Sequence, residues 1–350
     1  GFSLKRLSRS DAFALAATLQ ALAQAGLDPI PETLREEMGV IIGGGAGGLL
    51  EAESFFSDYL EGGARTARFS RLAPVSCAAS ANQLATQLNL WGPKTTLMTA
   101  CSSGATSVGM ARDLIRTGAA RVVIAGGTEP LSRLTFASFN ALQAVDPTHC
   151  RPFSGNRGGL SLGEGAGILI LESLAHARQR GAKVLGEILG YGVTCDSHHM
   201  TAPDVGASGA ARAMRAALDD AGLAPEAVEY ISAHGTATPL NDLMETRAIK
   251  EVFGLRAGKI PVSSTKAMHG HTLGASGALG SVVSLLAISE GFIPPTIHYE
   301  TPDPECDLDY VTEGARRAEL DVVLCNAFAF GGNNTTVLFG RVREEEARHG

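Results

Sequence analysis

The segment 99–104, Thr-Ala-Cys-Ser-Ser-Gly, sets a cysteine between a predicted strand and a predicted helix. An apolar strand ends just before Cys101, and the small residues that follow begin a helix over residues 105–111. Backbone N–H groups at the start of a helix favour negative charge, so the Cys101 thiol is biased toward the nucleophilic thiolate. Most cysteines in such a chain are buried structural residues. The strand–cysteine–helix setting favours a nucleophile here.

Histidines occur in two other segments that could act on a carbonyl group. His234 follows a predicted strand, and the small residues after it would let a substrate approach the imidazole. The hydroxyls of Thr236 and Thr238 could hydrogen-bond an amide-bearing substrate arm. In segment 264–277, Lys266 and His271 lie near a helix N-terminus, whose field disfavours a charged imidazole. Taken singly, a histidine after a strand is more often structural, and a lysine is more often solvated.

A fourth segment ends a predicted strand with glycines. Residues 326–334 read Asn-Ala-Phe-Ala-Phe-Gly-Gly-Asn-Asn. Glycines at a strand end expose backbone N–H groups, which suit an oxyanion. The four segments therefore offer a thiol, two imidazoles, an amine and N–H donors for carbonyl chemistry.

The elements that must position these groups occur in a pattern that repeats. Helix, glycine stop, strand and loop over residues 14–48 recur over residues 210–238. The strand at 95–99, Cys101 and the helix after it correspond to the strand at 261–264, the loop 266–271 and a helix over 272–290. Two consecutive matches in the same order favour duplication over chance similarity of α/β units. A pseudo-twofold axis would bring the loops with Cys101, His234 and His271 around a common centre.

Alternating β and α segments predict a layered α/β fold, with helices outside two sheets and around a central helix pair. The apolar strands 122–125 and 167–171 are typical of strands covered on both faces. We expect an N-terminal half, 1–180, with the nucleophile, and a C-terminal half, 181–350, with the histidines, the lysine and the glycine-rich loop. No linker separates autonomous domains.

Composition excludes several classes of function for this 350-residue chain. A net charge of −7 argues against nucleic acid or an anionic membrane as partner. No apolar run is expected to span a bilayer, and no secretory signal opens the sequence. The six cysteines lie far apart without a CxxC spacing, so we expect neither disulfides nor a metal site. A reducing cytoplasm fits this cysteine usage.

Together and in this order, the four segments resemble those of β-ketoacyl-[acyl-carrier-protein] synthases of the thiolase superfamily, closest to the elongating, type II class. The resemblance covers essentially the whole chain, and it includes the segments 151–153, 162–167, 196–201 and 293–296. It implies a thiolase-like α-β-α-β-α fold built from two duplicated halves.

The resemblance also implies a decarboxylative Claisen condensation. Cys101 resembles the nucleophile that takes an acyl group from the phosphopantetheine of an acyl carrier protein. His234 and His271 resemble the pair that binds the malonyl thioester carbonyl and promotes loss of CO₂. Lys266 resembles the lysine that orders the site through Glu245. The backbone N–H groups of Cys101 and Phe330 would hold the oxyanion, and no cofactor is bound to the chain.

Further positions have roles by the same resemblance. They are the gating group Phe328, Phe330 and Asp196, the pantetheine-tunnel hydroxyls Thr201, Thr236 and Thr238, the acyl-pocket position Ala46, and the carrier-protein contacts Lys5, Arg6, Arg9 and Arg65.

The chain departs from the family pattern in places. The family begins with a strand and a glycine-rich loop before the point that matches Gly1, so we expect this sequence to be part of a longer one. Ala329 replaces a glycine between two phenylalanines, and alanine resists positive φ, so the gate is expected to open less freely. Together with Asn241, Ala237 and the Asn-Asn pair at 333–334, this favours a branch making specialised polyene or polyketide chains.

Three alternatives remain open. A thiolase would condense acyl-CoA without decarboxylation and needs a second catalytic cysteine, for which Cys325 is the only candidate. A chain-length factor would be a non-catalytic partner, but such partners generally lose the nucleophile. A catalytic subunit could pair with such a factor. Dimerisation is expected in either case, because the family buries the strand before its nucleophile in a two-fold interface.

Overall fold

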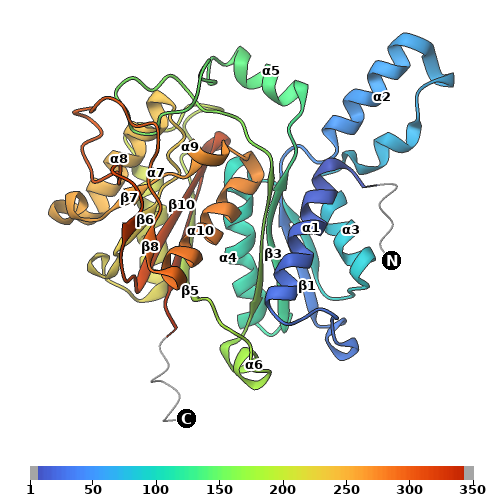
Figure 1. The fold of residues 1–350 in the computed structure, drawn as a ribbon, viewed down its shortest axis with the longest axis horizontal. Coiled ribbons are helices and arrows are strands. Elements are labelled where there is room, and N and C mark those ends of the chain that lie inside the picture. Colours follow the sequence, from blue (N-terminus) through green and yellow to red (C-terminus); the bar gives the residue numbers. More distant parts are fainter. Residues whose placement is uncertain (1–6, 343–350) are drawn as a thin grey trace.

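The computed structural model describes residues 7–342, which form two large β-sheets with helices between and around them (Figure 1), and a two-stranded sheet of β8 (Phe292–Ile293) and β9 (Arg316–Arg317). The first sheet has the order β2-β1-β3-β4, and its strands are β1 (Met38–Gly43), β2 (Lys94–Leu97), β3 (Val122–Glu129) and β4 (Gly165–Glu172). The second has the order β5-β11-β10-β6-β7, and its strands are β5 (Glu187–Cys195), β6 (Tyr230–Ser232), β7 (Val262–Ser263), β10 (Val322–Ala329) and β11 (Asn333–Gly340).

The two sheets repeat one topology. In the first, β1 is parallel to β2 and β3, and β4 is antiparallel to β3. In the second, β6 is parallel to β7 and β10, and β11 is antiparallel to β10. The predicted duplication of the fold is therefore confirmed. Strand β5 pairs with β11, and within residues 7–342 no strand occupies the matching position beside β4.

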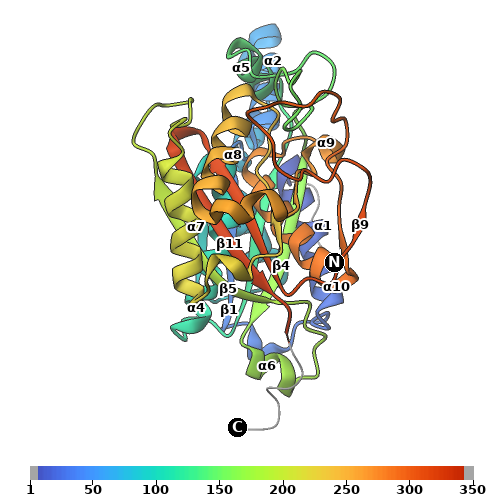
Figure 2. The same cartoon turned by 90° about the vertical axis from the view of Figure 1, so that its left-hand side faces the viewer.

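Helices form three further layers, as predicted. On the outer face of the first sheet lie α1 (Arg9–Gln24) and α3 (Ala79–Leu88); on that of the second lie α7 (Ser208–Ala221) and α8 (Pro239–Phe253). Between the sheets lie α4 (Ser103–Arg116) and α10 (Ser276–Glu290) (Figure 1). Figure 2, turned toward the second sheet, has α7 and α8 in front of its strands.

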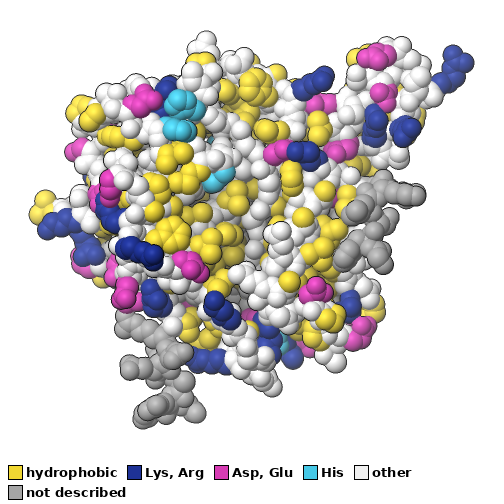
Figure 3. All heavy atoms as spheres, viewed as in Figure 1, with side chains coloured by type: hydrophobic (Ala, Val, Ile, Leu, Met, Phe, Trp, Pro, Cys, Tyr) yellow, Lys and Arg dark blue, Asp and Glu magenta, His cyan; other side chains and the backbone are white. Residues whose placement is uncertain are grey.

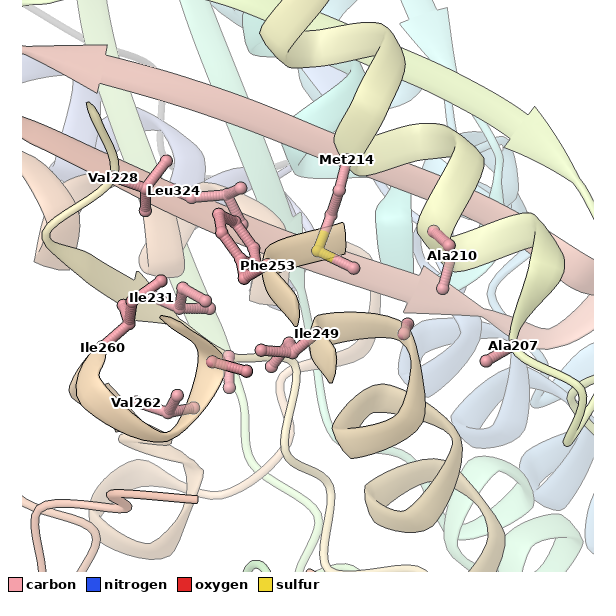
Figure 4. Close-up of a cluster of buried hydrophobic side chains, with 14 of the residues drawn as sticks. Ala207, Ala210, Met214, Val228, Ile231, Ile249, Phe253, Ile260, Val262 and Leu324 are labelled. Carbon is pink, nitrogen blue, oxygen red and sulfur yellow. The ribbon is translucent and has the colours of Figure 1, made fainter. Parts of the chain in front are cut away.

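Each helical layer covers its sheet with buried apolar side chains. Figure 4 shows the outer cluster of the second half, where Met214 of α7, Phe253 of α8 and Leu324 of β10 converge. Two other clusters fill the space between the sheets and the space beneath α1 and α3. Burying one such side chain contributes about 1.5–3 kcal/mol, so these clusters hold the layers together.

The two central helices cross at very short distance. A Cβ added at Gly104 would lie 2.7 Å from the backbone nitrogen of Ala278, and one added at Gly277 would lie 2.6 Å from that of Ala105. No larger residue fits either position without moving a helix. Cys101 lies two residues before α4 and His271 five residues before α10, so the crossing brings both to the same end of the fold.

The stretch Leu273–Glu290, which contains α10, corrects one expectation from sequence. Its 18 residues have a mean hydropathy of 1.4, long and apolar enough to cross a membrane by length and composition. More than half of it (56%) is buried inside the protein. Its apolar character is that of a core helix covered by two sheets.

The remaining elements lie at the periphery. Helices α2 (Leu49–Gly62) and α5 (Arg133–Ala141) lie at one end of the molecule, and α6 (Leu174–Gln179) lies at the other (Figures 1 and 2). Glu53 of α2 accepts hydrogen bonds from the backbone nitrogens of Arg133 (3.1 Å) and Leu134 (2.6 Å), which joins α2 to the start of α5. The short elements are α9 (Lys266–His269), β8 (Phe292–Ile293) and β9 (Arg316–Arg317).

Candidate active site

A cavity of about 380 Å³ lies at the end of the fold where α4 and α10 begin. It brings together most of the residues singled out from the sequence, although they come from both halves of the chain. Those that line it are Cys101, Asp196, Thr201, His234, Thr236, Thr238, His271, Phe328 and Phe330. One chamber therefore contains the thiol, both imidazoles and the three threonine hydroxyls.

Cys101 lies in a single 3₁₀ turn, Ala100–Ser102, that leads into α4. Its side chain is almost fully buried, and this burial raises the pKa of the thiol to about 12. The Lys266 charge and the backbone N–H groups of Phe330 and Cys101 act in the opposite direction, but they do not offset the loss of water. The expected bias toward thiolate is therefore wrong for the resting site, because the sequence pattern does not reveal desolvation.

The N–H donors foreseen for an oxyanion are next to the sulfur. The same backbone groups that lower the Cys101 pKa belong to Phe330 and Cys101. Phe330 follows β10, and Gly331 and Gly332 after it have φ of 79° and 72°. Because β-carbon-bearing residues avoid these angles, the glycines allow the chain to turn back into β11. The turn places the Phe330 N–H close enough to the thiol to lower its pKa.

A buried carboxylate holds the backbone of the loop that contains His234. Glu245 of α8 accepts hydrogen bonds from the backbone nitrogens of His234 (2.8 Å) and Gly235 (2.7 Å), and Asn326 also donates to it, at 3.1 Å. The His234 and His271 rings lie edge to face with centroids 5.3 Å apart. Within the described residues the buried Nδ1 of His234 has no hydrogen-bond partner.

The contacts of His271 fix its tautomer. Its Nδ1 lies 2.7 Å from the Ser276 hydroxyl oxygen, and the Leu273 backbone N–H donates to the same nitrogen at 3.3 Å. Since a backbone N–H can only donate, Nδ1 is the acceptor and the ring hydrogen is on Nε2. His271 therefore presents an N–H donor on the side of the ring opposite α10.

Both imidazoles are neutral at physiological pH. Burial, followed by the nearby Lys266 charge, lowers the pKa of His234 and of His271 well below the ordinary 6.5. The helix field inferred from sequence is not the main cause of this shift. Neutral rings that donate hydrogen bonds stabilise a developing negative oxygen without competing for its proton.

Glu245 interacts both with the His234 loop and with the charge of Lys266. Burial raises the pKa of Glu245 to about 7. Burial lowers the pKa of Lys266, and the Glu245 carboxylate acts to raise it. Glu245 makes its hydrogen bonds with the backbone of the His234 loop and with the Asn326 side chain, and it acts on Lys266 through its charge. It is therefore Glu245 that orders the loop, while Lys266 sets the local charge.

Acid pH is expected to destabilise the protein through these histidines. The contribution of these histidines to the free energy of unfolding should fall as pH drops below about 6.5, because the unfolded chain then binds protons that buried His234 and His271 do not bind, whereas Glu245, with its raised pKa, acts in the opposite direction. Each contributes a slope of at most about 1.4 kcal/mol per pH unit. Urea unfolding at pH 7, 6 and 5 measures it. The free energy of unfolding of His234→Asn should depend less steeply on pH than that of the wild type, and the exposed-site control His198→Asn should match the wild type. Equal slopes in the wild type and both variants would contradict this prediction.

Several predicted residues lie outside the cavity. Ala46 donates its backbone N–H to Glu129 (2.5 Å), a buried carboxylate of β3 that also accepts from Gly45 and Gly274. Arg9 pairs with Glu164, with Nε to Oε2 at 2.7 Å, so its charge is already matched. Arg65 is exposed, just after α2. Lys5 and Arg6 lie outside the described residues.

The segment after β10 is joined to the loop that contains Asp196. Gly331 donates its N–H to the Met200 carbonyl (2.8 Å), and Asp196 donates its own to the Gly332 carbonyl (2.9 Å). Asn334 adds a side-chain hydrogen bond to Asp196 (2.7 Å). Ala329 is extended, with φ −147° and ψ 156°, so alanine is unstrained in this conformation. Whether it restricts opening stays a prediction.

Sequence reasoning missed much of the cavity wall. The lining residues not singled out are Phe139, Leu142, Gln143, Ala144, Leu160, Ala202, Pro203, Pro239, Leu240 and Met244. Asn241, Ala329 and Asn334, noted from sequence only as departures from the family pattern, line the cavity as well. The lining residues at 239–244 lie one or two helical turns after the His234 motif. Their closeness to that motif in the sequence could have indicated that they line the cavity. Those at 139–144 come from α5 and the loop after it, and nothing in their sequence marks them.

Comparison with known proteins agrees with this geometry. Residues 1–177 match the family model described as beta-ketoacyl synthase, N-terminal domain, and residues 185–300 match beta-ketoacyl synthase, C-terminal domain. The chain is 48% identical over 344 residues to 3-oxoacyl-[acyl-carrier-protein] synthase 2 of Synechocystis sp., with 96% of this chain and 82% of that protein covered.

Solved structures share the same arrangement. The ishigamide ketosynthase/chain length factor superposes with a TM-score of 0.93 at 38% identity, covering 97% of this chain and 84% of that chain. A type II polyketide ketosynthase in complex with its acyl-carrier protein, AntDE:AntF, superposes with a TM-score of 0.91 at 33% identity, covering 97% and 86%. With both family models matched in order along the sequence, the chain belongs to the beta-ketoacyl synthase family.

Proposed function

We propose that this protein is a 3-oxoacyl-[acyl-carrier-protein] synthase that joins an acyl group held on Cys101 to the two-carbon unit of malonyl-[acyl-carrier protein], with release of CO₂. The observation that carries the proposal is the single cavity that contains the Cys101 thiol and two neutral imidazoles. A thiol alone would serve many acyl transfers. Two neutral N–H donors beside it suit an enolate, which exists only after carbon–carbon cleavage.

The first step is acyl transfer to the enzyme. The Cys101 sulfur attacks the thioester carbonyl of the acyl carrier, the carbon–sulfur bond to phosphopantetheine breaks, and the Cys101 proton passes to the departing carrier thiolate. Because the thiol has a pKa of about 12, it loses this proton during the attack rather than beforehand. The N–H groups of Cys101 and Phe330 stabilise the tetrahedral oxyanion.

The second step is decarboxylation and condensation. The malonyl carboxylate leaves as CO₂, and its bonding electron pair forms an enolate whose oxygen accepts hydrogen bonds from His271 Nε2–H and His234. The enolate carbon attacks the Cys101 thioester, forming the new carbon–carbon bond. Cys101 leaves as a thiolate and takes up a proton from solvent, which restores the thiol. The product is 3-oxoacyl-[acyl-carrier protein].

The thiolase alternative fails on the position of its second cysteine. Cys325 lies on β10 within the core cluster between the sheets, and it does not line the cavity. A Cβ at Gly280 of α10 would lie 2.9 Å from its sulfur, so this thiol is packed against a helix backbone. Burial raises its pKa to about 11. Cys325 is thus a structural residue, which leaves one nucleophile.

The two activities separate in one assay. The protein is incubated with an acyl carrier and malonyl carrier, or with acetyl-CoA and acetoacetyl-CoA without malonyl substrate. Mass spectrometry of the carrier should give a 3-oxoacyl product that requires malonyl groups, with CO₂ released in equal amount. Acetyl exchange without malonyl substrate, and no malonyl-dependent product, would overturn the proposal.

Phosphopantetheine on a carrier protein is the substrate arm we propose for this cavity. Thr201, Thr236 and Thr238 all line it and supply hydroxyls for the amides of such an arm. The family resemblance implies a carrier protein with an acidic face. The exposed Arg65 can contact that face, whereas the Arg9 side chain is already paired with Glu164. Figure 3 shows Lys and Arg side chains interspersed with Asp and Glu on the projecting α2 region. The six cysteines are free thiols, in keeping with a proposed cytoplasmic location.

We further propose a dimer through β2, either of two copies or with a chain-length factor. Strand β2 is an edge of its sheet, and Lys94 and Thr95 are exposed. The carbonyls of Pro93 and Leu97 accept from β1, so in this parallel pair the Thr96 N–H faces the open edge. An open edge of this kind is a template for another strand.

Light scattering after size exclusion tests the two-copy form. The purified chain should have about twice its own mass of 36.2 kDa. Thr96→Pro removes the outward N–H and should yield a monomer, whereas Thr96→Val keeps the N–H and should stay dimeric. A monomer that catalyses condensation at the full rate would contradict both forms of the dimer.

A further inference from the structure

We propose that Phe139 of α5 is a positioning residue that holds the ring of Phe330 beside Cys101, so that access to the thiol depends on a ring contact between α5 and the segment after β10. The meaning of this contact for catalysis rests on the proposed function. The geometry and its test do not, because they concern only the exposure of the thiol.

The contact is a stacked aromatic pair. The ring centroids of Phe139 and Phe330 are 5.5 Å apart, and the ring planes differ by 21°. Both rings line the cavity together with Cys101, and both are half-buried. Neither belongs to any of the three core clusters. The pair is therefore a separate contact at the site rather than part of the hydrophobic core.

Phe139 is the one large side chain that α5 turns inward. Leu134 and Phe136 of the same helix are 55% and 52% exposed. Thr135, one turn earlier on the same face, is the other residue of α5 that is not exposed. A helix without buried residues has little packing energy of its own to orient Phe139. The burial that Phe139 has comes from the cavity wall and the Phe330 ring.

The two rings differ in how firmly their backbones are held. At its start, α5 is fixed by Glu53 and by the Ser132 side chain, which accepts from Thr135 N at 3.0 Å. Beyond its end, the Ala144 carbonyl accepts from Leu160 N at 2.8 Å. Phe330, in contrast, precedes two glycines at positive φ. Hydrogen bonds hold Gly331 and Gly332 to the loop 196–200, so the freedom that remains lies at Phe330 itself, and the Phe139 ring opposes it.

Movement of Phe330 would change the site in two ways. Its ring would leave the Cys101 side of the cavity, and its backbone N–H would move away from the thiol whose pKa it now lowers. The stack thus favours the conformation in which the thiol is covered and the oxyanion donor is in position. Loss of the stack should shift the equilibrium toward an uncovered thiol.

The rate of Cys101 alkylation by iodoacetamide, resolved by peptide mass spectrometry on the full folded chain, measures this equilibrium. An aromatic pair of this kind changes an equilibrium by about two- to tenfold. We expect Phe139→Ala to increase the alkylation rate by about that factor, Phe139→Leu to give an intermediate increase, and Phe139→Tyr to keep the wild-type rate. Urea midpoints of all variants verify that they are folded.

Phe136→Ala is the matched control, since it truncates an aromatic ring on the same helix that points to solvent. It should leave Cys101 alkylation unchanged. The proposal is overturned by an unchanged rate in both Phe139→Ala and Phe139→Leu. It is equally overturned by a matching increase in Phe136→Ala, because that would reflect general loosening of α5. Alkylation needs no substrate, so failure of the proposed reaction would not alter this result.

Discussion

Cys101→Ala is expected to reduce formation of the 3-oxoacyl product by about 10⁴-fold or more, because no other group in the cavity can carry the acyl chain as a thioester. Malonyl decarboxylation should continue, since His234 and His271 are untouched. Carrier-bound products and released CO₂ are quantified in the same reaction. The expected signature is therefore CO₂ without condensation.

The matched control for this variant is Cys325→Ala. It removes a buried thiol of the second half that lies outside the cavity lining, so condensation should persist at a rate near that of the wild type. Full condensation by Cys101→Ala would refute the nucleophile. Loss of condensation in Cys325→Ala, with the fold intact, would revive the thiolase alternative.

His271→Ala is expected to lower the rate of malonyl decarboxylation by about 10²- to 10³-fold. It removes an N–H donor aimed at the enolate oxygen, and loss of one donor of this kind costs about 3–4 kcal/mol. Transfer of the acyl group to Cys101 should be affected much less, because that step uses the backbone donors. Quench-flow with mass spectrometry of acyl-Cys101 separates the two steps.

Two neighbouring residues make this test specific. His269→Ala removes an exposed histidine outside the cavity lining and should leave decarboxylation unchanged. Ser276→Ala keeps the imidazole but deletes the hydroxyl at Nδ1, so a loss of about tenfold is expected from poorer orientation. Equal rates for His271→Ala and the wild type would remove His271 from the mechanism.

The fold followed from sequence because its information is local and repeated. Strands that end in glycine loops, followed by helices of small residues, occur twice, and duplicated β-α units dock in one way. The position of Cys101 and His271 at the starts of two central helices was therefore predictable. The boundary at 180 lies between β4 and β5 and stays a prediction.

Electrostatics and the cavity wall did not follow from sequence. The Cys101 pKa depends on how completely water is removed, and this depends on segments from both halves rather than on the helix start. Lys266 was expected to order the site through Glu245, which stays a prediction, and the sequence did not reveal that the Glu245 carboxylate accepts from the backbone of the His234 loop. Phe139 belongs to a largely exposed helix, and only the tertiary fold brings it to Phe330.

The glycine crossing of α4 and α10 has a consequence for attempts to alter this catalyst. Any side chain added at Gly104 or Gly277 would meet backbone atoms and push the thiol and the imidazole of His271 apart together. The distance between the Cys101 thiol and the His271 imidazole is therefore set by how the two helices cross. A substitution at this crossing cannot move one of these groups without moving the other. Directed evolution toward new acyl chains should accordingly accept changes in peripheral loops and reject them at this contact.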